Sequence, residues 1–339
     1  MLNVIQLTRQ LVDIPSVTGE EREVGDFLFD LLQSEGWECR RQQVEEDRFN
    51  ILATRGPSNV LLTTHMDTVP PFFESEEDED YVYGRGACDA KGVAAAMICA
   101  ARELADQDQK TPALLFVVGE ETDSAGARKA RDLGLQFSYI IDGEPTDNEL
   151  VTAHKGIILA RVLCTGITAH SSHPERGESA IDKLIEALAK LKRTEFPSDS
   201  RLGKTFLNIG IIEGGWASNV IADQAEAVIL VRTVTDSRKY VDLLNDTIGN
   251  LGHVDIIKTT EPQEMESVDG FPSKVVAYGT DIPALRTLGR PLLIGPGSVF
   301  EAHTAREKIA KRELLEAVEI YKRLVRHLAE SSKFQVLSS

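Results

Sequence analysis

Short apolar runs alternate with amphipathic helical patterns in the first part of the chain. Runs of strand length occur at residues 39–44, 59–64, 113–118 and 139–141. Between them, apolar residues recur at helical spacing in the segments 24–32, 91–104 and 124–133. Thr18 and Glu21 fit a capping box ahead of the first of these helices. Strands that alternate with helices predict an α/β fold, with a mostly parallel sheet covered by helices.

A different order of elements begins near residue 156. Two amphipathic helices, at 180–191 and 241–251, lie among four strand patterns, at 157–165, 206–212, 225–234 and 254–259. The order β-α-β-β-α-β is that of a ferredoxin-like α+β unit, which can fold as its own domain. After this unit, the strand and helix patterns typical of the first part of the chain return. We therefore expect a discontinuous domain of residues 1–155 and 262–339, with a second domain, 156–261, inserted into it.

The composition excludes several classes of protein. The chain has 339 residues and a formal net charge of −17, which argues against a nucleic-acid partner. No apolar run approaches the ~20 residues that span a bilayer, so no membrane partner is expected. The N-terminal residues lack the features of a signal peptide, and the four cysteines form no C-x-x-C pair. These features predict a cytoplasmic protein with reduced thiols.

Polar residues gather at the ends of the predicted strands. Four clusters follow strand-like runs: His65 with Asp67, Glu120 with Glu121, Asp142 with Glu144 and, after a short loop, His303. Ligands of open α/β sheets bind beyond the carboxyl ends of the parallel strands, so these clusters are expected to meet at one edge. Asp89, just ahead of a helix, could reach the same edge. Two imidazoles and at least four carboxylates are costly to assemble without cations.

This donor set predicts a metal site. Mixed histidine and carboxylate ligands suit Zn²⁺, with Co²⁺ or Mn²⁺ as alternatives. A single catalytic zinc uses only three protein ligands, so the surplus indicates two metals ~3.5–4 Å apart that share a water. One carboxylate that binds neither metal could then act as general base.

Each cluster taken alone has a structural explanation. His65 and Asp67 could be a hydrogen-bonded pair in a loop, and the acids at 120–121 could begin a solvated helix. Thr304 and Glu307 fit a capping box, so Glu307 need not be functional. The clusters together, in this order, favour a metal-dependent hydrolase.

Seven short motifs surround these clusters: His-Met-Asp-Thr-Val-Pro at 65–70, Gly-Arg-Gly at 84–86, Asp-Ala-Lys-Gly at 89–92, Gly-Glu-Glu at 119–121, Gly-Glu-Pro-Thr at 143–146, His-Lys-Gly at 154–156 and Ala-His-Thr at 302–304. They resemble the motifs of the dinuclear-zinc aminoacylase and metallopeptidase family, which includes acetylornithine deacetylase, succinyl-diaminopimelate desuccinylase and several dipeptidases. The resemblance covers nearly the whole chain, including the inserted domain.

The resemblance implies a role for each residue of the site. The implied ligands are His65 and Glu144 for one zinc, Glu121 and His303 for the other, and Asp89 as a bridge between the two. Asp67 would orient His65, and Glu120 would take a proton from the bridging water and deliver it to the leaving amine. Asp142 is an alternative ligand, although the intact Gly-Glu-Pro-Thr motif favours Glu144.

The resemblance also gives the inserted domain the role of a lid and a homodimer surface. Ala-His-Ser-Ser-His-Pro at 169–174 is similar to the family motif whose first histidine, here His170, enters the partner's active site as an oxyanion donor. Asn219, Arg232, Gly279 and Thr280 lie where relatives bind a substrate carboxylate.

The reaction implied is hydrolysis of an amide bond in an N-acyl amino acid or a small peptide. The His-Lys-Gly motif and the short chain favour acetylornithine deacetylase-like activity. A dipeptidase or carboxypeptidase is the alternative within the family. A non-catalytic relative that binds amino-acid derivatives would lack a ligand or the base, and neither is missing here. A two-metal phosphoesterase would need more cationic groups near the motifs.

Overall fold

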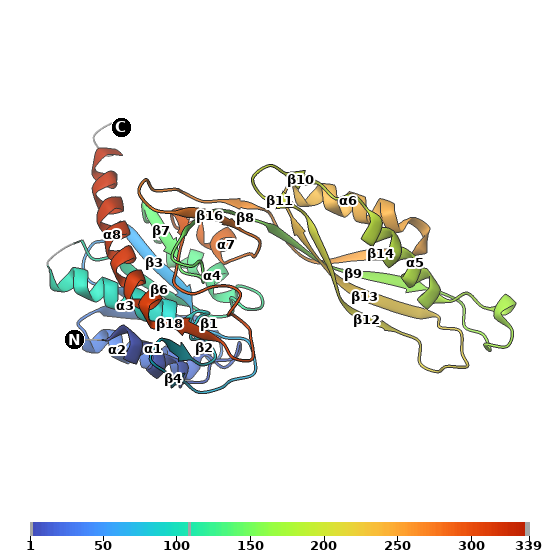
Figure 1. The fold of residues 1–339 in the computed structure, drawn as a ribbon, viewed down its shortest axis with the longest axis horizontal. Coiled ribbons are helices and arrows are strands. Elements are labelled where there is room, and N and C mark those ends of the chain that lie inside the picture. The colour runs from blue at the N-terminus through green and yellow to red at the C-terminus, as the bar shows by residue number, and fades with distance from the viewer. Residues whose placement is uncertain (1–2, 108–109, 336–339) are drawn as a thin grey trace. The chain divides into compact units, whose positions relative to one another are not determined.

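The structure, a computed structural model, describes residues 3–107 and 110–335. Its contacts divide the chain into two compact units (Figure 1). The first unit holds the described residues of Met1–Thr152, Met265–Lys274 and Thr280–Ser339, and the second holds Ala153–Glu264 and Val275–Gly279. Strands β8 (Leu150–His154) and β16 (Ser273–Val276) have residues in both. Within this described part of the chain, no helix has the length and apolar composition needed to cross a membrane.

A six-stranded sheet, in the order β1-β2-β6-β3-β7-β17, forms the centre of the first unit. Its strands are β1 (Glu38–Glu45), β2 (Arg48–Thr54), β3 (Val60–His65), β6 (Ala113–Val117), β7 (Tyr139–Asp142) and β17 (Arg290–Leu293). The four neighbours β6, β3, β7 and β17 are parallel, whereas β1 and β2 form an antiparallel edge. A small separate sheet contains β4 (Glu76–Glu77), β5 (Tyr81–Tyr83) and β18 (Lys308–Ala310).

Helices cover both faces of the larger sheet. They are α1 (Val4–Val12), α2 (Arg22–Ser34), α3 (Lys91–Asp106), α4 (Ala125–Ala130), α7 (Ile282–Leu285) and α8 (Lys311–Gln335). Because successive strand residues point to opposite faces, Leu114 of β6 packs in the core with α1, α3 and α8, whereas Leu115 packs with α4 and α7. The alanine-rich α3 packs against α1 and α8 and is buried over most of its length. This architecture confirms the α/β fold class.

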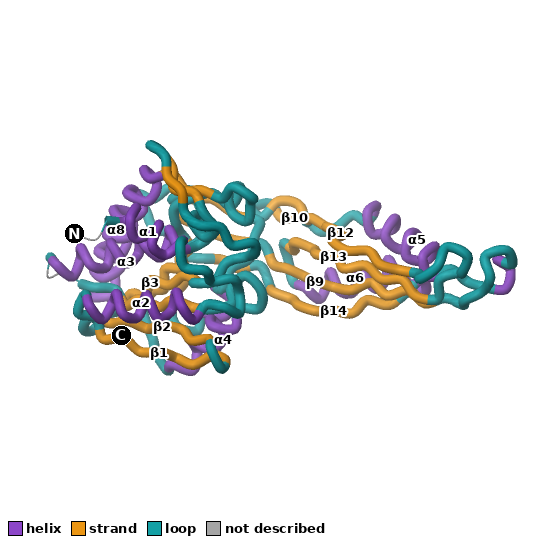
Figure 2. Tube along the Cα trace, turned by 90° about the horizontal axis from the view of Figure 1, so that it is seen from below, coloured by secondary structure: helices purple, strands orange, loops and turns teal. Residues whose placement is uncertain are grey.

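The second unit is built on a four-stranded antiparallel sheet, in the order β12-β13-β9-β14 (Figure 2). Its strands are β9 (Gly156–Thr165), β12 (Phe206–Gly214), β13 (Gln224–Thr233) and β14 (His253–Thr260), with short β10 (Ser198–Asp199), β11 (Gly203–Lys204) and β15 (Gln263–Glu264). The helices α5 (Ala180–Arg193) and α6 (Ser237–Ile248) share one apolar core with β9 and β13. This order of elements and strands confirms the predicted ferredoxin-like fold.

The capping box predicted from Thr18 and Glu21 is wrong. Helix α2 begins at Arg22, and Glu21 makes no side-chain capping bond. The Thr18 hydroxyl instead donates to Asp67 at 2.8 Å, and both Glu21 oxygens accept from the Arg48 guanidinium, at 2.6 and 2.9 Å. The Glu21 carboxylate also accepts the nearby N–H of Gly19 at 3.0 Å, but the reciprocal bonds of a Thr18–Glu21 capping box do not form.

Candidate active site

His65 is the last residue of β3 and is buried. Its Nδ1 lies 2.9 Å from the backbone oxygen of Asp67, and its Nε2 lies 3.0 Å from Oδ1 of Asp89. A carbonyl oxygen only accepts, so Nδ1 carries a proton and Nε2 faces a carboxylate. That contact requires either a second proton on the ring or a cation. Burial lowers the pKa of His65, but the hydrogen bonds to Asp67 and Asp89, together with the negative charges of Asp89 and Glu144, raise it well above its usual value.

Asp89 lies between two histidines that are far apart in sequence. Its Oδ1 faces His65, and its Oδ2 lies 3.3 Å from Nε2 of His303. The same His303 nitrogen lies 3.0 Å from Glu121, and hydrogen bonds to Asp89 and Glu121 raise the pKa of His303 to about 10. His303 has a positive φ of 60°, which non-glycine residues seldom adopt outside constrained sites. One carboxylate thus faces two imidazoles, the geometry expected of a bridging ligand.

Three glutamates complete the cluster of carboxylates. His65, Asp89 and Glu121 each place one possible ligand atom within 4.8 Å of the others, and so do His65, Glu120 and Glu144. Burial and, next, the charge of Asp281 raise the pKa of Glu120. Burial and then the charge of Glu120 raise the pKa of Glu144. Divalent cations relieve such repulsion, so these donors fit a metal site of the His/carboxylate type.

Asp142 and Glu144, the two rival ligands, differ in their surroundings. Glu144 belongs to one of the two groups above, and its Oε1 lies 4.0 Å from Nε2 of His65. Asp142 is buried, belongs to neither group, and has one oxygen with no hydrogen-bond partner among the described residues. Burial, followed by the charge of Asp281, raises the pKa of Asp142 well above its usual value. The geometry favours Glu144 as the ligand.

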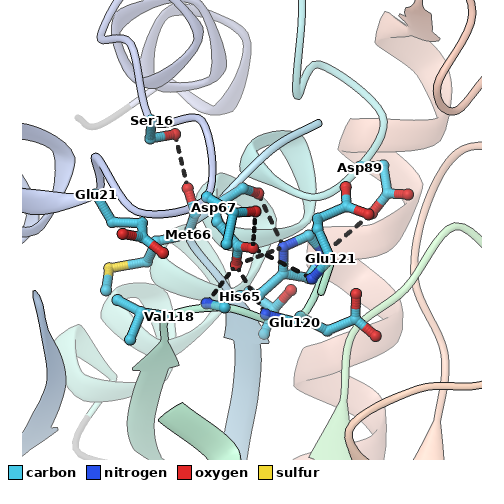
Figure 3. A network of polar contacts seen from close by, with 12 residues as sticks. Ser16, Glu21, His65, Met66, Asp67, Asp89, Val118, Glu120 and Glu121 are labelled. Atoms are coloured by element: carbon cyan, nitrogen blue, oxygen red, sulfur yellow. Dashed lines mark hydrogen bonds and ion pairs between the residues drawn. The ribbon is translucent and has the colours of Figure 1, made fainter. Parts of the chain in front are cut away.

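Asp67 connects β3 to the turn that follows β6 (Figure 3). Its Oδ1 accepts the backbone N–H groups of Gly119 and Glu120 at 2.9 and 3.1 Å, and its Oδ2 accepts that of Glu121 at 3.2 Å. Its Oδ1 lies 3.5 Å from Nδ1 of His65, farther than its own backbone oxygen. The carboxylate therefore holds the Gly119–Glu121 turn more directly than it orients His65.

His170 and Asn219 are neighbours within the second unit. The backbone N–H of Ser171 donates to the carbonyl oxygen of Asn219 at 3.0 Å, and His170 forms an isolated bridge with Val220. Both side chains are exposed. The hydroxyl of Ser172 lies 2.8 Å from Nδ1 of His170 and fixes one side of the ring.

The other predicted substrate residues are divided between the units. Gly279 belongs to the second unit and Thr280 to the first, where its hydroxyl binds Asp142. Arg232, near the end of β13, has a buried Nη1 with no hydrogen-bond partner among the described residues. The buried Nε2 of His154, in the same unit, also lacks a partner there. Such groups cost free energy unless a ligand or water satisfies them.

Glu307 was missed as a site residue because its spacing from Thr304 fits a capping box. That prediction is wrong: the Thr304 hydroxyl donates to the backbone oxygen of Glu301, and α8 begins only at Lys311. Glu307 is fully buried and binds the backbone ahead of α3, including that of Asp89. The sequence signal that could have pointed to Glu307 is Arg85 in the Gly-Arg-Gly motif, the residue with which it forms an ion pair.

Known proteins resemble this chain in sequence over most of its length. Residues 61–327 match the profile of peptidase family M20/M25/M40. An M20-domain protein of Schizosaccharomyces pombe is 38% identical over 336 residues, which cover 95% of this chain and 84% of the relative. A protein of Aspergillus terreus named a probable carboxypeptidase is 37% identical over 94% of this chain and 84% of its own length.

Solved structures share the fold along almost the whole chain. A tripeptidase of Staphylococcus aureus superposes with a TM-score of 0.80 at 22% identity, over 96% of this chain and 98% of that one. A dinuclear metal-binding M20 peptidase of Bacillus subtilis superposes with a TM-score of 0.70 at 17% identity, over 96% and 97%. The sequence matches show that this chain is a hydrolase that belongs to peptidase family M20/M25/M40.

Proposed function

We propose that this chain is a two-metal exopeptidase that hydrolyses a peptide bond near a free carboxylate, as a carboxypeptidase or dipeptidase does. The observation that carries the proposal is the position of Asp89, whose two oxygens face His65 and His303. The relative named a probable carboxypeptidase favours a peptide over the acetylornithine-type substrate that the sequence alone put first.

The residues of the first unit divide the chemistry among them. The proposed ligands are His65 and Glu144 for one ion, Glu121 and His303 for the other, and Asp89 for both. Zn²⁺ suits these donors, with Co²⁺ or Mn²⁺ as alternatives. When bound, two such ions lower the pKa of an attacking water and polarise the scissile carbonyl. Glu120 accepts the proton of that water and passes it to the leaving amine, which departs neutral.

The second unit supplies substrate recognition and a homodimer surface in this proposal. The unpartnered Nη1 of Arg232 would bind the carboxylate of the substrate, since a guanidinium binds that group with two parallel hydrogen bonds. Strand β12 is at an edge of its sheet and exposes Ile211 and Ile212, which suits pairing with a second copy. His170 would then donate to the oxyanion formed in the partner's site.

The test compares three substrate types on the purified, metal-loaded protein: dipeptides with a free carboxylate, the same dipeptides amidated at the C-terminus, and N-acetyl-ornithine. We expect kcat/KM at least ~10-fold higher for the free dipeptides than for the amidated ones, because the charged hydrogen bonds are lost. Equal rates on amidated peptides would remove carboxylate recognition. A preference for N-acetyl-ornithine would restore the deacetylase assignment.

A further inference from the structure

Glu307 is a fully buried carboxylate that precedes β18. Its Oε1 accepts three backbone N–H groups, those of Gly86, Cys88 and Asp89, each at 3.0 Å. Its Oε2 accepts from Nη1 of Arg85 at 2.7 Å. The backbone oxygen of Glu307 also accepts the N–H of Gly84 at 3.0 Å. Five of the six residues from 84 to 89 therefore donate a hydrogen bond to this single residue.

Arg85, the cationic partner, is itself held on several sides. Its side chain is buried, and its Nε donates to the backbone oxygen of Pro71 at 3.2 Å. Its guanidinium carbon lies 5.0 Å from the centre of the Phe73 ring. A buried ion pair is costly to desolvate, and it is retained where charged hydrogen bonds repay that cost. Here those bonds shape the loop that ends in Asp89.

The loop ends at the residue on which the proposed metal site depends. The N–H of Asp89 binds Glu307, while its carboxylate faces His65 and His303. Glu307 lies four residues after His303 in the chain. One side chain thus links the segment that carries a proposed terminal ligand to the segment that carries the proposed bridge.

We propose that Glu307 is a positioning residue that sets where Asp89 lies between the two metal sites. The proposal rests on the two-metal function above. The hydrogen bonds from Gly86, Cys88 and Asp89 fix the loop backbone, so the Asp89 carboxylate can reach both sites without reorganising. Substitution of a residue that orients a metal ligand typically lowers metal affinity about 10–100-fold.

The variant Glu307→Gln keeps the shape of the side chain but turns an N–H₂ group toward either Arg85 or the loop amides. Glu21→Gln is the matched control, because Glu21 is also buried and paired with an arginine, and among the described residues its side chain forms hydrogen bonds or ion pairs only with Gly19 and Arg48 and with none of the five proposed ligands. Ions per chain are measured after dialysis against buffers of fixed free Zn²⁺ or Co²⁺, together with the unfolding temperature of the metal-free proteins. The Co²⁺ absorption spectrum reports on ligand geometry.

We expect wild type and Glu21→Gln to bind about two ions per chain, and Glu307→Gln to bind the weaker ion about 10–100-fold less tightly, with an altered Co²⁺ spectrum. If Glu307→Gln does not fold, Glu307→Asp, which keeps the charge but shortens the reach, should show a smaller loss of the same kind. Wild-type affinity and spectrum in the folded position-307 variants would overturn the proposal, as would an equal loss in Glu21→Gln. A wild type that binds no divalent ion would overturn the two-metal function and this inference together.

Discussion

The carboxylate of Asp67 accepts the backbone N–H of Glu120 at 3.1 Å, so one acidic side chain fixes the proposed base to the strand that carries the proposed ligand His65. The same carboxylate accepts the N–H groups of Gly119 and Glu121. Neighbouring parallel strands β3 and β6 bring the two segments to one sheet edge, but strand pairing alone does not set the turn after β6. Asp67 does so with three bonds.

Asp67→Asn should therefore impair the turn as well as His65. An amide keeps one acceptor oxygen but presents N–H groups to a backbone that offers only donors, so we expect metal affinity or kcat to fall about 10–100-fold. Thr18→Val is the control, because it removes only the hydroxyl that donates to Asp67. Metal content and kcat are measured for both variants. Equal effects of the two substitutions would contradict the prediction that the bonds from the Gly119–Glu121 turn to Asp67 are needed for metal binding or turnover.

Glu120→Gln should separate metal binding from turnover. The amide is close in size to the acid but cannot accept the proton of the attacking water, so we expect kcat to fall about 10²–10⁴-fold or more. Because Glu120 is not among the proposed ligands, the variant should still bind about two ions per chain, as measured by atomic emission. Loss of an ion together with activity would make Glu120 a ligand instead, which its place beside His65 and Glu144 also permits.

The ends of the parallel strands made most of the site predictable from sequence. His65 ends β3, Glu120 follows β6 and Glu144 follows β7. The apolar pattern that marks the strands, and the place of each residue at a strand end, are enough to bring the three to one edge of the sheet. Strand β2 was not predicted, because the buried Asn50 interrupts its apolar pattern. Asn50 is tolerated there because it bonds Gln42 and the backbone at Gly126.

Long-range polar contacts were the part that the sequence could not provide. Thr304 and Glu307 have the spacing of a capping box, but Glu307 lies more than two hundred positions from the loop that it binds, and local spacing contains no information about that loop. The same holds for Thr18, whose partner Asp67 lies on another segment. Patterns predict the elements and their order, whereas buried polar pairs follow from how distant segments meet.

Removal of metal should destabilise the protein, and more strongly as the pH rises. Burial raises the pKa of Glu120 and Glu144, and hydrogen bonds to carboxylates raise that of His303 to about 10. A group whose pKa is higher in the folded state contributes stability at low pH and loses it as the pH rises through the folded value. The metal-free protein therefore loses stability as the pH rises. Metal binding strengthens over the same range, because the ligands must be deprotonated to bind. We therefore expect the gap in unfolding temperature between metal-loaded and chelated protein to widen from pH 5 to pH 8, by calorimetry. A constant gap would contradict the assignment of Glu144 and His303 as ligands.

Arg232→Met should affect only substrates that carry the free carboxylate. The loss of charged hydrogen bonds is worth about 1.5–3 kcal/mol, or roughly 10–100-fold in kcat/KM. Amidated dipeptides, which never made those bonds, should be cleaved at unchanged rates. Arg161→Met is a control in the same unit, because that arginine is on the exposed side of β9 and pairs with Glu226. If both substrate types lose activity equally, Arg232 has a structural role.

Mixing two inactive variants should restore activity if His170 acts across a homodimer. A His170→Ala chain retains Glu120, and a Glu120→Gln chain retains His170, so one of the two sites in each hybrid dimer is complete. Random exchange makes half of the dimers hybrid, which gives about a quarter of wild-type activity, because the two sites of a twofold dimer are equivalent. A chain with both substitutions, mixed with His170→Ala chains, should restore nothing. Subunit exchange is confirmed with differently tagged chains. Confirmed exchange without recovery would show that His170 does not act in the partner's site.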